Sequence, residues 1–423
     1  MRTNELILYR YMEHEDLLRD MTFLIDNADN DYYNKEDLKS LLFENLNELI
    51  ELAANYGFEG NLWHTFLTFL LANSENAYST ACEVVGEVEG SVNKAALHDF
   101  KIFKELFEYD LKEMGEKLGT DSLELIEEYH PVNAKGHVFN KRIRDRICDL
   151  SKALAQTDDA EEFKTTVTQF YKEFGVGTFG LHKAFRIEHT EEGAQIVPIT
   201  KIAHVHLDDL VGYELAKKKL IENTEAFVQG RKANNCLLFG DAGTGKSSSI
   251  KGSIIEVYKH QFQDLNDVIA QVKNRNYRFI IYMDDLSFEE FEIEYKYLKA
   301  VIEGGLERKP ENVLIYATSN RRHLIREKFS DKEERRDDLH TSDTVQEKLS
   351  LAYRFGLKIY FGSPSKKEFQ NIVRVLADKH GITMSEEELF LKANQWELQY
   401  GGLSGRTAQQ FIDHLLGQER KDV

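Results

Sequence analysis

The sequence contains few of the residues that mark secreted, disulfide-bonded or metal-binding proteins. Its 423 residues include three cysteines and four prolines. Cys82, Cys148 and Cys236 lie far apart, so no pair has the short spacing of a metal or redox motif. No apolar run approaches the roughly 18 residues of a membrane helix, and the acidic N-terminus is unlike a signal peptide. We therefore expect a protein with reduced thiols, located in the cytoplasm and not in a membrane.

Acidic residues outnumber basic ones, and the excess lies in one half of the chain. The formal net charge is −19, of which residues 1–200 carry −18, from 20 Lys and Arg against 38 Asp and Glu. Residues 201–423 have a net charge of −1. Such an acidic half either is simply well solvated or binds a basic partner, and it repels the phosphates of a nucleic acid. We expect an unknown protein partner for this half and treat nucleic acid as the weaker alternative.

The pattern of apolar residues divides the chain into three parts. Residues 1–200 read as successive helices, with apolar residues at helical spacing in 35–57. In residues 201–363, helical segments alternate with short, continuous apolar runs, which are typical of parallel strands buried on both faces. Residues 364–423 are helical again. The predicted fold class is α/β, with an all-helical N-terminal domain (1–200), a core with a parallel sheet (201–363) and a small helical C-terminal lid (364–423).

A phosphate-binding loop follows the first apolar run of the core. Residues 240–247, GDAGTGKS, fit the pattern G-x-x-x-x-G-K-[ST] directly after a predicted buried strand. Glycines let backbone N–H groups point at a phosphate, the lysine bridges the outer phosphates, and the serine hydroxyl holds Mg²⁺. We therefore predict a site for ATP and Mg²⁺, with Ser247 as a metal ligand. The residues assigned to nucleotide binding are Gly240, Asp241, Ala242, Gly243, Thr244, Gly245, Lys246, Ser247 and Ser248.

Acidic and amide side chains follow two further predicted strands. The run FIIYM ends in Asp284 and Asp285, and the run VLIYATS ends in Asn320. In a P-loop core, one acid holds Mg²⁺ and another residue positions or activates the attacking water. We assign Asp284 to the metal, Asp285 to water activation, and Asn320 to orienting the water or contacting the γ-phosphate.

The order of these motifs resembles that of AAA+ ATPases. The series continues with Arg-Phe before a fourth strand and with GLSGR near the C-terminus. The segment DDLVGY at 208–213 resembles the one that lies along the adenine in that superfamily, which implies contacts from Val211 and Gly212. More narrowly, DDLSFEE, VIEGGLERKPENVLIYATSNRRHL and EKLSLAYRFGL are similar to an uncharacterised bacterial AAA+ family with a helical N-terminal region. The resemblance implies an ATPase and brings no known substrate.

The resemblance also implies roles for two arginines. Arg354 is the candidate arginine finger, which reaches the γ-phosphate bound by a neighbouring subunit, so hydrolysis would need a homo-oligomer. Arg406 is the candidate second sensor, which contacts the γ-phosphate from the lid. For each, the alternative is a surface arginine paired with one of the abundant acids.

Two features depart from the AAA+ pattern. Asp285 stands where those proteins usually have glutamate and is one methylene shorter, which favours slow hydrolysis. Only seven residues separate Lys246 from the apolar run that begins at Ile254, fewer than the roughly ten to twelve of a parallel crossover. We expect either a stunted helix or a helix that continues past Gly252 and replaces the edge strand, and we favour the second.

The main functional prediction is Mg-dependent ATP binding and hydrolysis, coupled to remodelling or switching of an unknown partner. One alternative is a nucleotide-gated binding switch with little or no hydrolysis, which Asp285 and the short segment near Gly252 favour. Another is a DNA-associated loader-type ATPase, which the near-neutral C-terminal half permits and the acidic N-terminal half disfavours.

Overall fold

The computed structural model describes two compact units of the chain, each considered by itself. One unit comprises residues 1–183 and 198–201, and the other comprises 184–197 and 202–423. The residues described are 2–131, 139–191, 193–199, 210–246, 254–288, 292–303, 310–320, 324 and 351–419. Within these ranges, no helix is long and apolar enough to cross a membrane.

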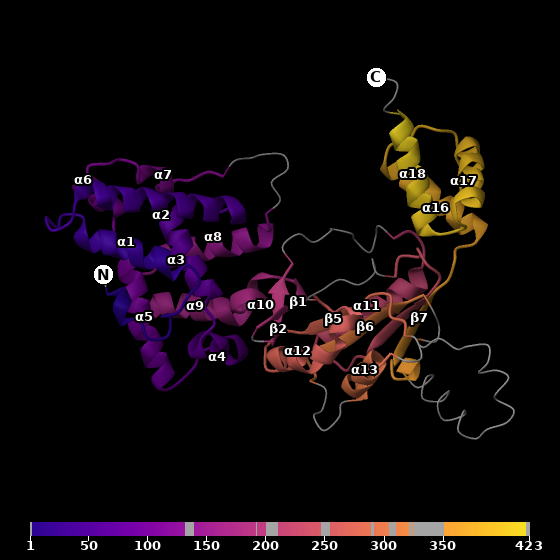
Figure 1. Ribbon diagram of the computed structural model, residues 1–423, viewed down its shortest axis with the longest axis horizontal. Coiled ribbons are helices and arrows are strands. Elements are labelled where there is room, and N and C mark those ends of the chain that lie inside the picture. The colour runs from indigo at the N-terminus through magenta and orange to yellow at the C-terminus, as the bar shows by residue number, and fades with distance from the viewer. Residues whose placement is uncertain are drawn as a thin grey trace. The chain divides into compact units, whose positions relative to one another are not determined.

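The first unit consists of helices packed around a central apolar helix, α3 (Figure 1). Nearly every residue of α3 is buried, from Leu62 to Ala72, because neighbouring helices cover it on all sides. Six helices begin behind an Asn or Asp whose side chain accepts a backbone N–H, which fixes where they start. The elements are η1 (Thr3–Glu5), α1 (Glu15–Asn27), α2 (Lys35–Tyr56), α3 (Leu62–Asn73), α4 (Ala77–Val85), α5 (Ser91–Glu108), α6 (Leu111–Leu118), α7 (Glu124–Glu127), α8 (Lys141–Ala155), α9 (Ala160–Phe174) and α10 (Gly177–Leu181).

A buried carboxylate anchors the N-terminal segment of this unit. Asp99 on α5 is fully buried and accepts the backbone N–H groups of Ile7, Leu8 and Tyr9 at 3.0, 2.7 and 3.1 Å. Three convergent N–H donors replace the water that an ionised carboxylate would otherwise need. The segment before α1 is therefore held as part of the helical core.

The second unit is built on a seven-stranded sheet in the order β2-β1-β4-β5-β6-β3-β7. The pairs β1–β4, β4–β5, β5–β6, β6–β3 and β3–β7 are parallel. All residues of β5 and β6 are buried, as the continuous apolar runs predicted. The strands are β1 (Ala184–Thr190), β2 (Gly193–Pro198), β3 (Cys236–Gly240), β4 (Ile254–Glu256), β5 (Phe279–Met283), β6 (Val313–Ser319) and β7 (Leu357–Phe361).

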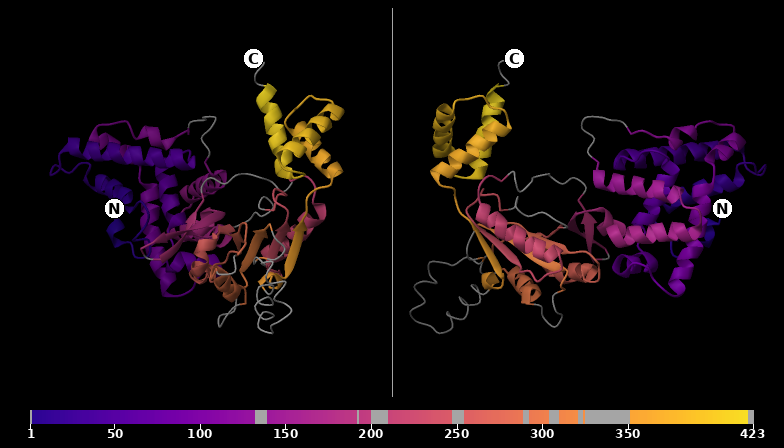
Figure 2. Two further views of the ribbon diagram at one scale, coloured as in Figure 1. Left: turned by 45° about the vertical axis from the view of Figure 1, so that its right-hand side comes forward. Right: turned by 180° about the vertical axis from the view of Figure 1, so that it is seen from behind.

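Helices of the core pack against this sheet, and three C-terminal helices form a small bundle (Figure 2). The core elements are α11 (Glu214–Val228), η4 (Lys259–Asp264), α12 (Leu265–Val272) and α13 (Glu294–Glu303). The bundle contains α16 (Lys366–Lys379), α17 (Glu386–Tyr400) and α18 (Gly405–Glu419), with an apolar cluster of its own around Phe369, Val373 and Phe411. The predicted α/β class, with a largely parallel sheet in the P-loop core, is confirmed.

The boundary of the helical part lies earlier than we expected. Residues 184–198 form β1 and β2 of the sheet, so the segment 1–200 is not all helical, and the unit division falls at Lys183. Phe185 and Ile187 are buried, while Arg186 and Glu188, which alternate with them along the strand, are exposed. This alternation is the signature of a strand with one covered face, and it is too short to stand out beside a long helical region.

A strand, not a continuous helix, follows the phosphate-binding loop. Ile254–Glu256 form β4, which lies between β1 and β5, with Ile255 opposite Phe185 and Ile281. Our preference for a helix through this run was wrong, because strands on both sides satisfy its backbone and Ile255 is fully buried. Gly252 and the rest of the segment 247–253, which carries Ser247 and Ser248, lie outside the described residues.

Candidate nucleotide-binding site

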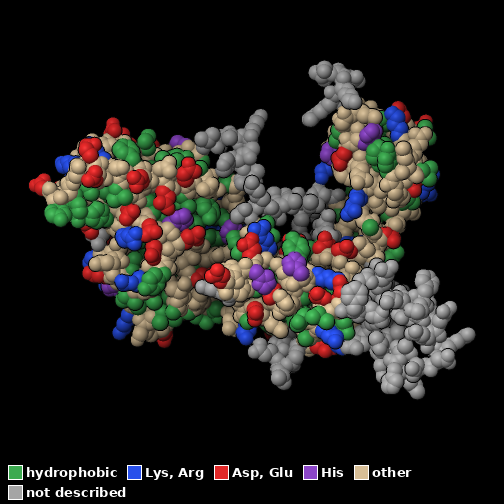
Figure 3. All heavy atoms as spheres, in the orientation of Figure 1, with side chains coloured by type: hydrophobic (Ala, Val, Ile, Leu, Met, Phe, Trp, Pro, Cys, Tyr) green, Lys and Arg blue, Asp and Glu red, His purple; other side chains and the backbone are tan. Residues whose placement is uncertain are grey.

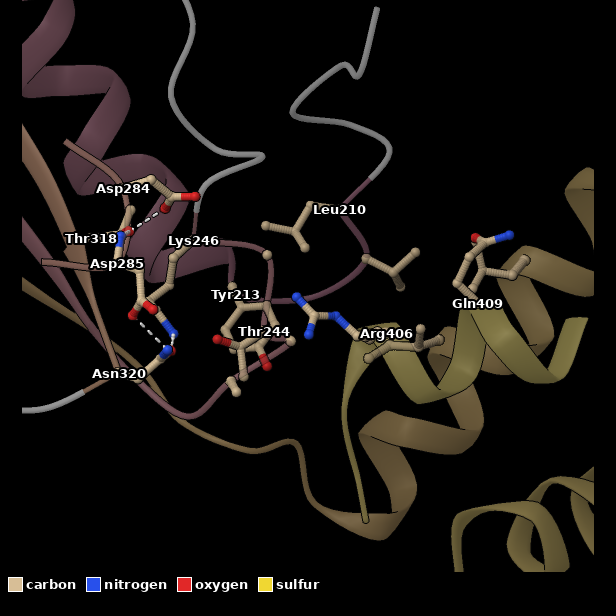
Figure 4. A pocket seen from close by; sticks show the side chains of 17 residues that line it. Leu210, Tyr213, Thr244, Lys246, Asp284, Asp285, Thr318, Asn320, Arg406 and Gln409 are labelled. Atoms are coloured by element: carbon tan, nitrogen blue, oxygen red, sulfur yellow. Dashed lines mark hydrogen bonds between the residues drawn. The ribbon is translucent and has the colours of Figure 1, made fainter. Parts of the chain in front are cut away.

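A cavity of about 490 Å³ lies at the carboxyl ends of β3, β5 and β6, beside the start of α18. Open α/β sheets bind their ligands at this edge. Side chains from the loop, the sheet and the C-terminal bundle face one another across it (Figure 4). Ten residues assigned from the sequence line the cavity: Val211, Ala242, Gly243, Thr244, Gly245, Lys246, Asp284, Asp285, Asn320 and Arg406.

Glycine is required in the phosphate-binding loop because the backbone passes close to other chain segments. Gly240 has φ of 139°, and a Cβ atom there would lie 2.0 Å from the carbonyl oxygen of Phe361 on β7. The next residue, Asp241, donates its N–H to the same oxygen at 3.0 Å and accepts the N–H of Ser363 at 2.7 Å. The loop is therefore fastened to the end of β7, and only glycine permits so close an approach.

The ammonium of Lys246 is buried and fully engaged within the site. Its Nζ donates to the carbonyl oxygens of Gly240 and Asp241 at 3.0 and 2.6 Å, and to Oδ1 of Asn320 at 3.0 Å. Burial lowers the pKa of Lys246, while the carboxylates of Asp241, Asp285 and Asp284 act in the opposite direction. The positive charge thus sits at the floor of the cavity, oriented by oxygen atoms of the loop.

The two acids after β5 are joined to β6. Asp284 accepts the hydroxyls of Tyr282 and Thr318, the first at 2.8 Å. Asp285 accepts Nδ2 of Asn320 at 2.8 Å, and its own N–H donates to Oγ1 of Thr318 at 2.9 Å. Since Asn320 also accepts from Lys246, its amide links the lysine to Asp285.

The C-terminal bundle completes the cavity from the opposite side. The N–H of Arg406, in the first turn of α18, donates to the carbonyl oxygen of Gly243 at 3.1 Å. Its guanidinium extends from α18 toward the phosphate-binding loop (Figure 4). Ser404 caps this helix by accepting the N–H of Thr407 at 3.1 Å. A cation is therefore presented to the loop from α18.

One part of the cavity wall is apolar. It is formed by Leu210, Val211 and Tyr213 on one side and by Ile372 and Leu376 of α16 on the other. The Tyr213 hydroxyl donates to the carbonyl oxygen of Gly362 at 2.9 Å, and burial raises the pKa of Tyr213 to about 12. The ring is therefore neutral and fixed at neutral pH, as suits a flat apolar ligand.

Several residues of the site were not identified from the sequence. These are Leu210, Tyr213, Thr318, Ile372, Leu376, Gly405 and Gln409. Thr318 lies on β6, two residues before Asn320, which follows the strand, and its hydroxyl so close to Asn320 could have singled it out. Ile372 and Leu376 of α16 carry no comparable sequence signal, because helical spacing alone assigns them to a core.

Some assigned residues do not line the cavity. Gly240 and Asp241 contribute carbonyl oxygens to Lys246, and Gly212 lies between two lining residues. Arg354 is absent from the wall and forms an ion pair with Glu303 at the end of α13. That contact agrees with the surface ion pair considered as its alternative, and an arginine acting on a neighbouring subunit would also lie outside its own cavity.

The donor set of the site fits a cation that arrives with a nucleotide. Mg²⁺ in such sites takes one or two protein oxygens, and phosphates and water supply the rest. Asp284 provides a carboxylate at the cavity wall. Among the described residues, no group of three or more His, Cys, Asp or Glu side chains could hold a metal ion. The residues therefore suit Mg²⁺ bound through phosphates better than an ion enclosed by protein.

Several solved structures are similar to about half of the chain. A variant of RuvB from Thermotoga maritima is 16% identical, with a TM-score of 0.35 over 50% of this chain and 65% of that one, just under two thirds of its length. RuvB from the same organism, described as a Holliday junction branch migration motor, is 14% identical, with a TM-score of 0.32 over 50% of this chain and 72% of that one. The AAA domain of FIGL-1 in complex with ADP is 16% identical, with a TM-score of 0.34 over 52% and 75%. Likeness at this level carries no argument about activity.

No curated protein matches the chain. Residues 180–419, more than half of the 423, match the family described as "Protein of unknown function (DUF815)". The matched residues include the whole sheet, the residues that line the cavity and the C-terminal bundle. These residues include the phosphate-binding loop, the largely parallel sheet and the arginine presented from α18, and the chain belongs to the DUF815 family.

Proposed function

We propose that this chain binds Mg-ATP in the cavity and hydrolyses it within a homo-oligomer. The observation that carries the proposal is the linked set Lys246–Asn320–Asp285. The amide of Asn320 joins the phosphate-binding lysine to the second acid, at 3.0 and 2.8 Å. Residues of three separate segments thus meet where phosphoryl transfer needs a cation, an oriented amide and a carboxylate.

Phosphate binding is the first role that these residues support. The phosphates of ATP would enter beside the loop, where the ammonium of Lys246 can exchange its carbonyl and amide partners for phosphate oxygens. Arg406 would contact the same anion from α18, so a bound nucleotide would hold the lid against the core. The adenine fits the apolar wall around Tyr213 and Ile372.

Hydrolysis is the second role. Asp284, together with Ser247, would hold Mg²⁺, which neutralises phosphate charge when bound. Asp285 would accept a proton from the attacking water, and Asn320 would orient that water through its amide. Since Asn320 already contacts Lys246 and Asp285, a γ-phosphate that takes over Lys246 would release the Asn320 carbonyl for the water.

The proposal of a homo-oligomer rests on the position of Arg354. This arginine lies outside the cavity of its own chain and pairs with Glu303. As an arginine finger it would exchange Glu303 for the γ-phosphate of a neighbouring subunit, an interaction worth about 10³- to 10⁵-fold in turnover where it has been measured. Turnover per subunit should then depend on protein concentration.

An unknown protein partner is proposed for the helical unit. Asp and Glu side chains are spread over the visible face of this unit, with Lys and Arg among them (Figure 3). A surface of this kind favours a basic protein and disfavours nucleic acid. ATP turnover would then remodel or switch that partner.

A nucleotide-gated switch is the second candidate function. Asp285 is one methylene shorter than glutamate, and its carboxylate is engaged by Asn320 at 2.8 Å. If the water cannot displace this contact, the protein would bind ATP and hydrolyse it slowly or not at all.

Phosphate release with Mg-ATP, measured over a range of protein concentrations, tests the proposal. Wild type is compared with Lys246→Ala, Arg354→Ala and the control Arg231→Ala, an exposed arginine that bonds Gln229. We expect turnover per subunit to rise with concentration, to vanish in the first two variants and to survive in the control. Full turnover in Arg354→Ala would contradict the finger, and ATP binding without phosphate release in wild type would establish the switch instead.

A further inference from the structure

A single hydroxyl connects the two acids of the site. In the β5–β6 register Met283 lies opposite Ala317, which brings the next residues, Asp284 and Thr318, face to face. The Thr318 hydroxyl donates to Oδ1 of Asp284 and accepts the N–H of Asp285 at 2.9 Å. Thr318 is 2% exposed, so water does not compete for these bonds.

The same segment of β6 holds the turn that follows the acids. The N–H of Leu286 donates to the carbonyl oxygen of Thr318 at 2.7 Å. The hydroxyl of Ser319 donates to the carbonyl oxygen of Leu286, also at 2.7 Å. The backbone of Asp285 and Leu286 is therefore fixed by β6 at consecutive positions.

One of the residues held by these bonds to β6, Asp285, has an unusual backbone conformation. Asp285 has φ of 49°, one of three described non-glycine residues in the left-handed region. Aspartate tolerates this region better than most residues, but it still needs surrounding contacts to stay there. In this conformation its carboxylate reaches Nδ2 of Asn320 at 2.8 Å. The direction of the Asp285 side chain thus depends on the turn, and the turn depends on β6.

We propose that Thr318 is a positioning residue whose hydroxyl fixes the orientation of both Asp284 and Asp285. By donating, it orients Asp284 toward the cation, and by accepting, it keeps Asp285 in the left-handed conformation that aims the shorter carboxylate at the water. Clamping the backbone in this way compensates for aspartate standing where a longer acid is usual. The inference rests on the proposed Mg-ATP function, and it identifies a residue that the motifs do not mark.

Two matched pairs of variants separate the effect of the Thr318 hydroxyl from the effect of side-chain packing. Thr and Val have the same shape, and Ser and Ala both lack the threonine methyl, so each pair differs mainly by one oxygen atom. Wild type, Thr318→Val, Thr318→Ser and Thr318→Ala are compared by thermal melting, by binding of a fluorescent ADP analogue with and without Mg²⁺, and by phosphate release. Lys246→Ala serves as the binding-deficient control.

We expect Thr318→Val to bind the ADP analogue without Mg²⁺ as wild type does, and to lose most of the tightening that Mg²⁺ produces. Its kcat should fall about 10- to 100-fold, the usual effect of removing a side chain that orients a metal ligand. Thr318→Ser should stay within about threefold of wild type and Thr318→Ala should behave like Thr318→Val.

The proposal is overturned if Thr318→Val retains both the Mg²⁺ effect and kcat. It is also overturned if Thr318→Ser is as impaired as Thr318→Ala, because packing and not the hydroxyl would then matter. If Thr318→Val does not fold, the Ser and Ala pair decides alone. Should wild type bind ADP with a Mg²⁺ effect but release no phosphate, the hydrolysis proposal fails, while loss of that effect in the hydroxyl-free variants still supports the role of Thr318.

Discussion

Replacing Gly240 by alanine tests whether the fit between the phosphate-binding loop and β7 needs glycine. The added Cβ would lie 2.0 Å from the carbonyl oxygen of Phe361 and 2.6 Å from its carbonyl carbon. Both atoms belong to a backbone that β3 fixes by parallel pairing, with Gly240 opposite Phe361, so neither can rotate away. The φ of 139° adds strain of its own for any residue with a side chain.

The expected cost of Gly240→Ala has two parts. The backbone conformation costs about 1–3 kcal/mol in a residue other than glycine. Moving the loop away from β7 also breaks the bonds that Asp241 makes with Phe361 and Ser363, at about 0.5–1.5 kcal/mol each. We expect a loss of roughly 2–6 kcal/mol in the free energy of unfolding of this unit. Nucleotide affinity should fall as well, since Lys246 bonds the carbonyl oxygens of the displaced residues.

Gly401→Ala is the matched control for this prediction. Gly401 has φ of 131°, and a Cβ there would meet no atom within 4 Å. It therefore carries the conformational strain without the clash. Urea unfolding followed by circular dichroism and titration with a fluorescent ADP analogue would be applied to both variants. Equal losses in stability would refute the reasoning, because the close approach to Phe361 would then contribute nothing.

The remaining predictions concern three charged side chains. Asp99→Asn should destabilise the helical unit by about 2–3 kcal/mol, because an amide cannot accept three N–H groups as a carboxylate does. Thermal melting would measure this loss, and nucleotide affinity should be unchanged. Glu303→Gln should change the free energy of unfolding by less than about 1 kcal/mol, since the Arg354–Glu303 pair is one-third exposed. It should also raise phosphate release at low protein concentration, because Arg354 is freed from Glu303. An unaltered dependence of turnover on protein concentration would contradict this. For Lys246 the folded-state pKa lies below the unfolded value, so the unfolded chain binds more protons between the two values. The stability of the nucleotide-free protein should therefore rise as pH increases through that alkaline window while affinity for ADP falls, and neither trend should occur in Lys246→Met.

The structure shows why some neighbours of the motif residues were overlooked. Thr318 and Ser319 are ordinary strand residues in sequence, and their role appears only when β6 is laid beside β5 with Thr318 opposite Asp284. The assignment of Ile254–Glu256 failed for a related reason. A segment this short suits a helix or a strand, and the choice depends on β1 and β5, which are distant in the chain.

The local chemistry of this protein can be predicted from its amino-acid sequence. The phosphate-binding loop, Asp284, Asp285 and Asn320 could be recognised because each follows a continuous apolar run, and buried parallel strands have that pattern whatever surrounds them. Three features required the folded chain: β1 extends the sheet, Asn320 links Lys246 to Asp285, and α16 supplies an apolar wall. These features are contacts between segments far apart in the chain, and strand order and register, which no local pattern encodes, bring the segments together.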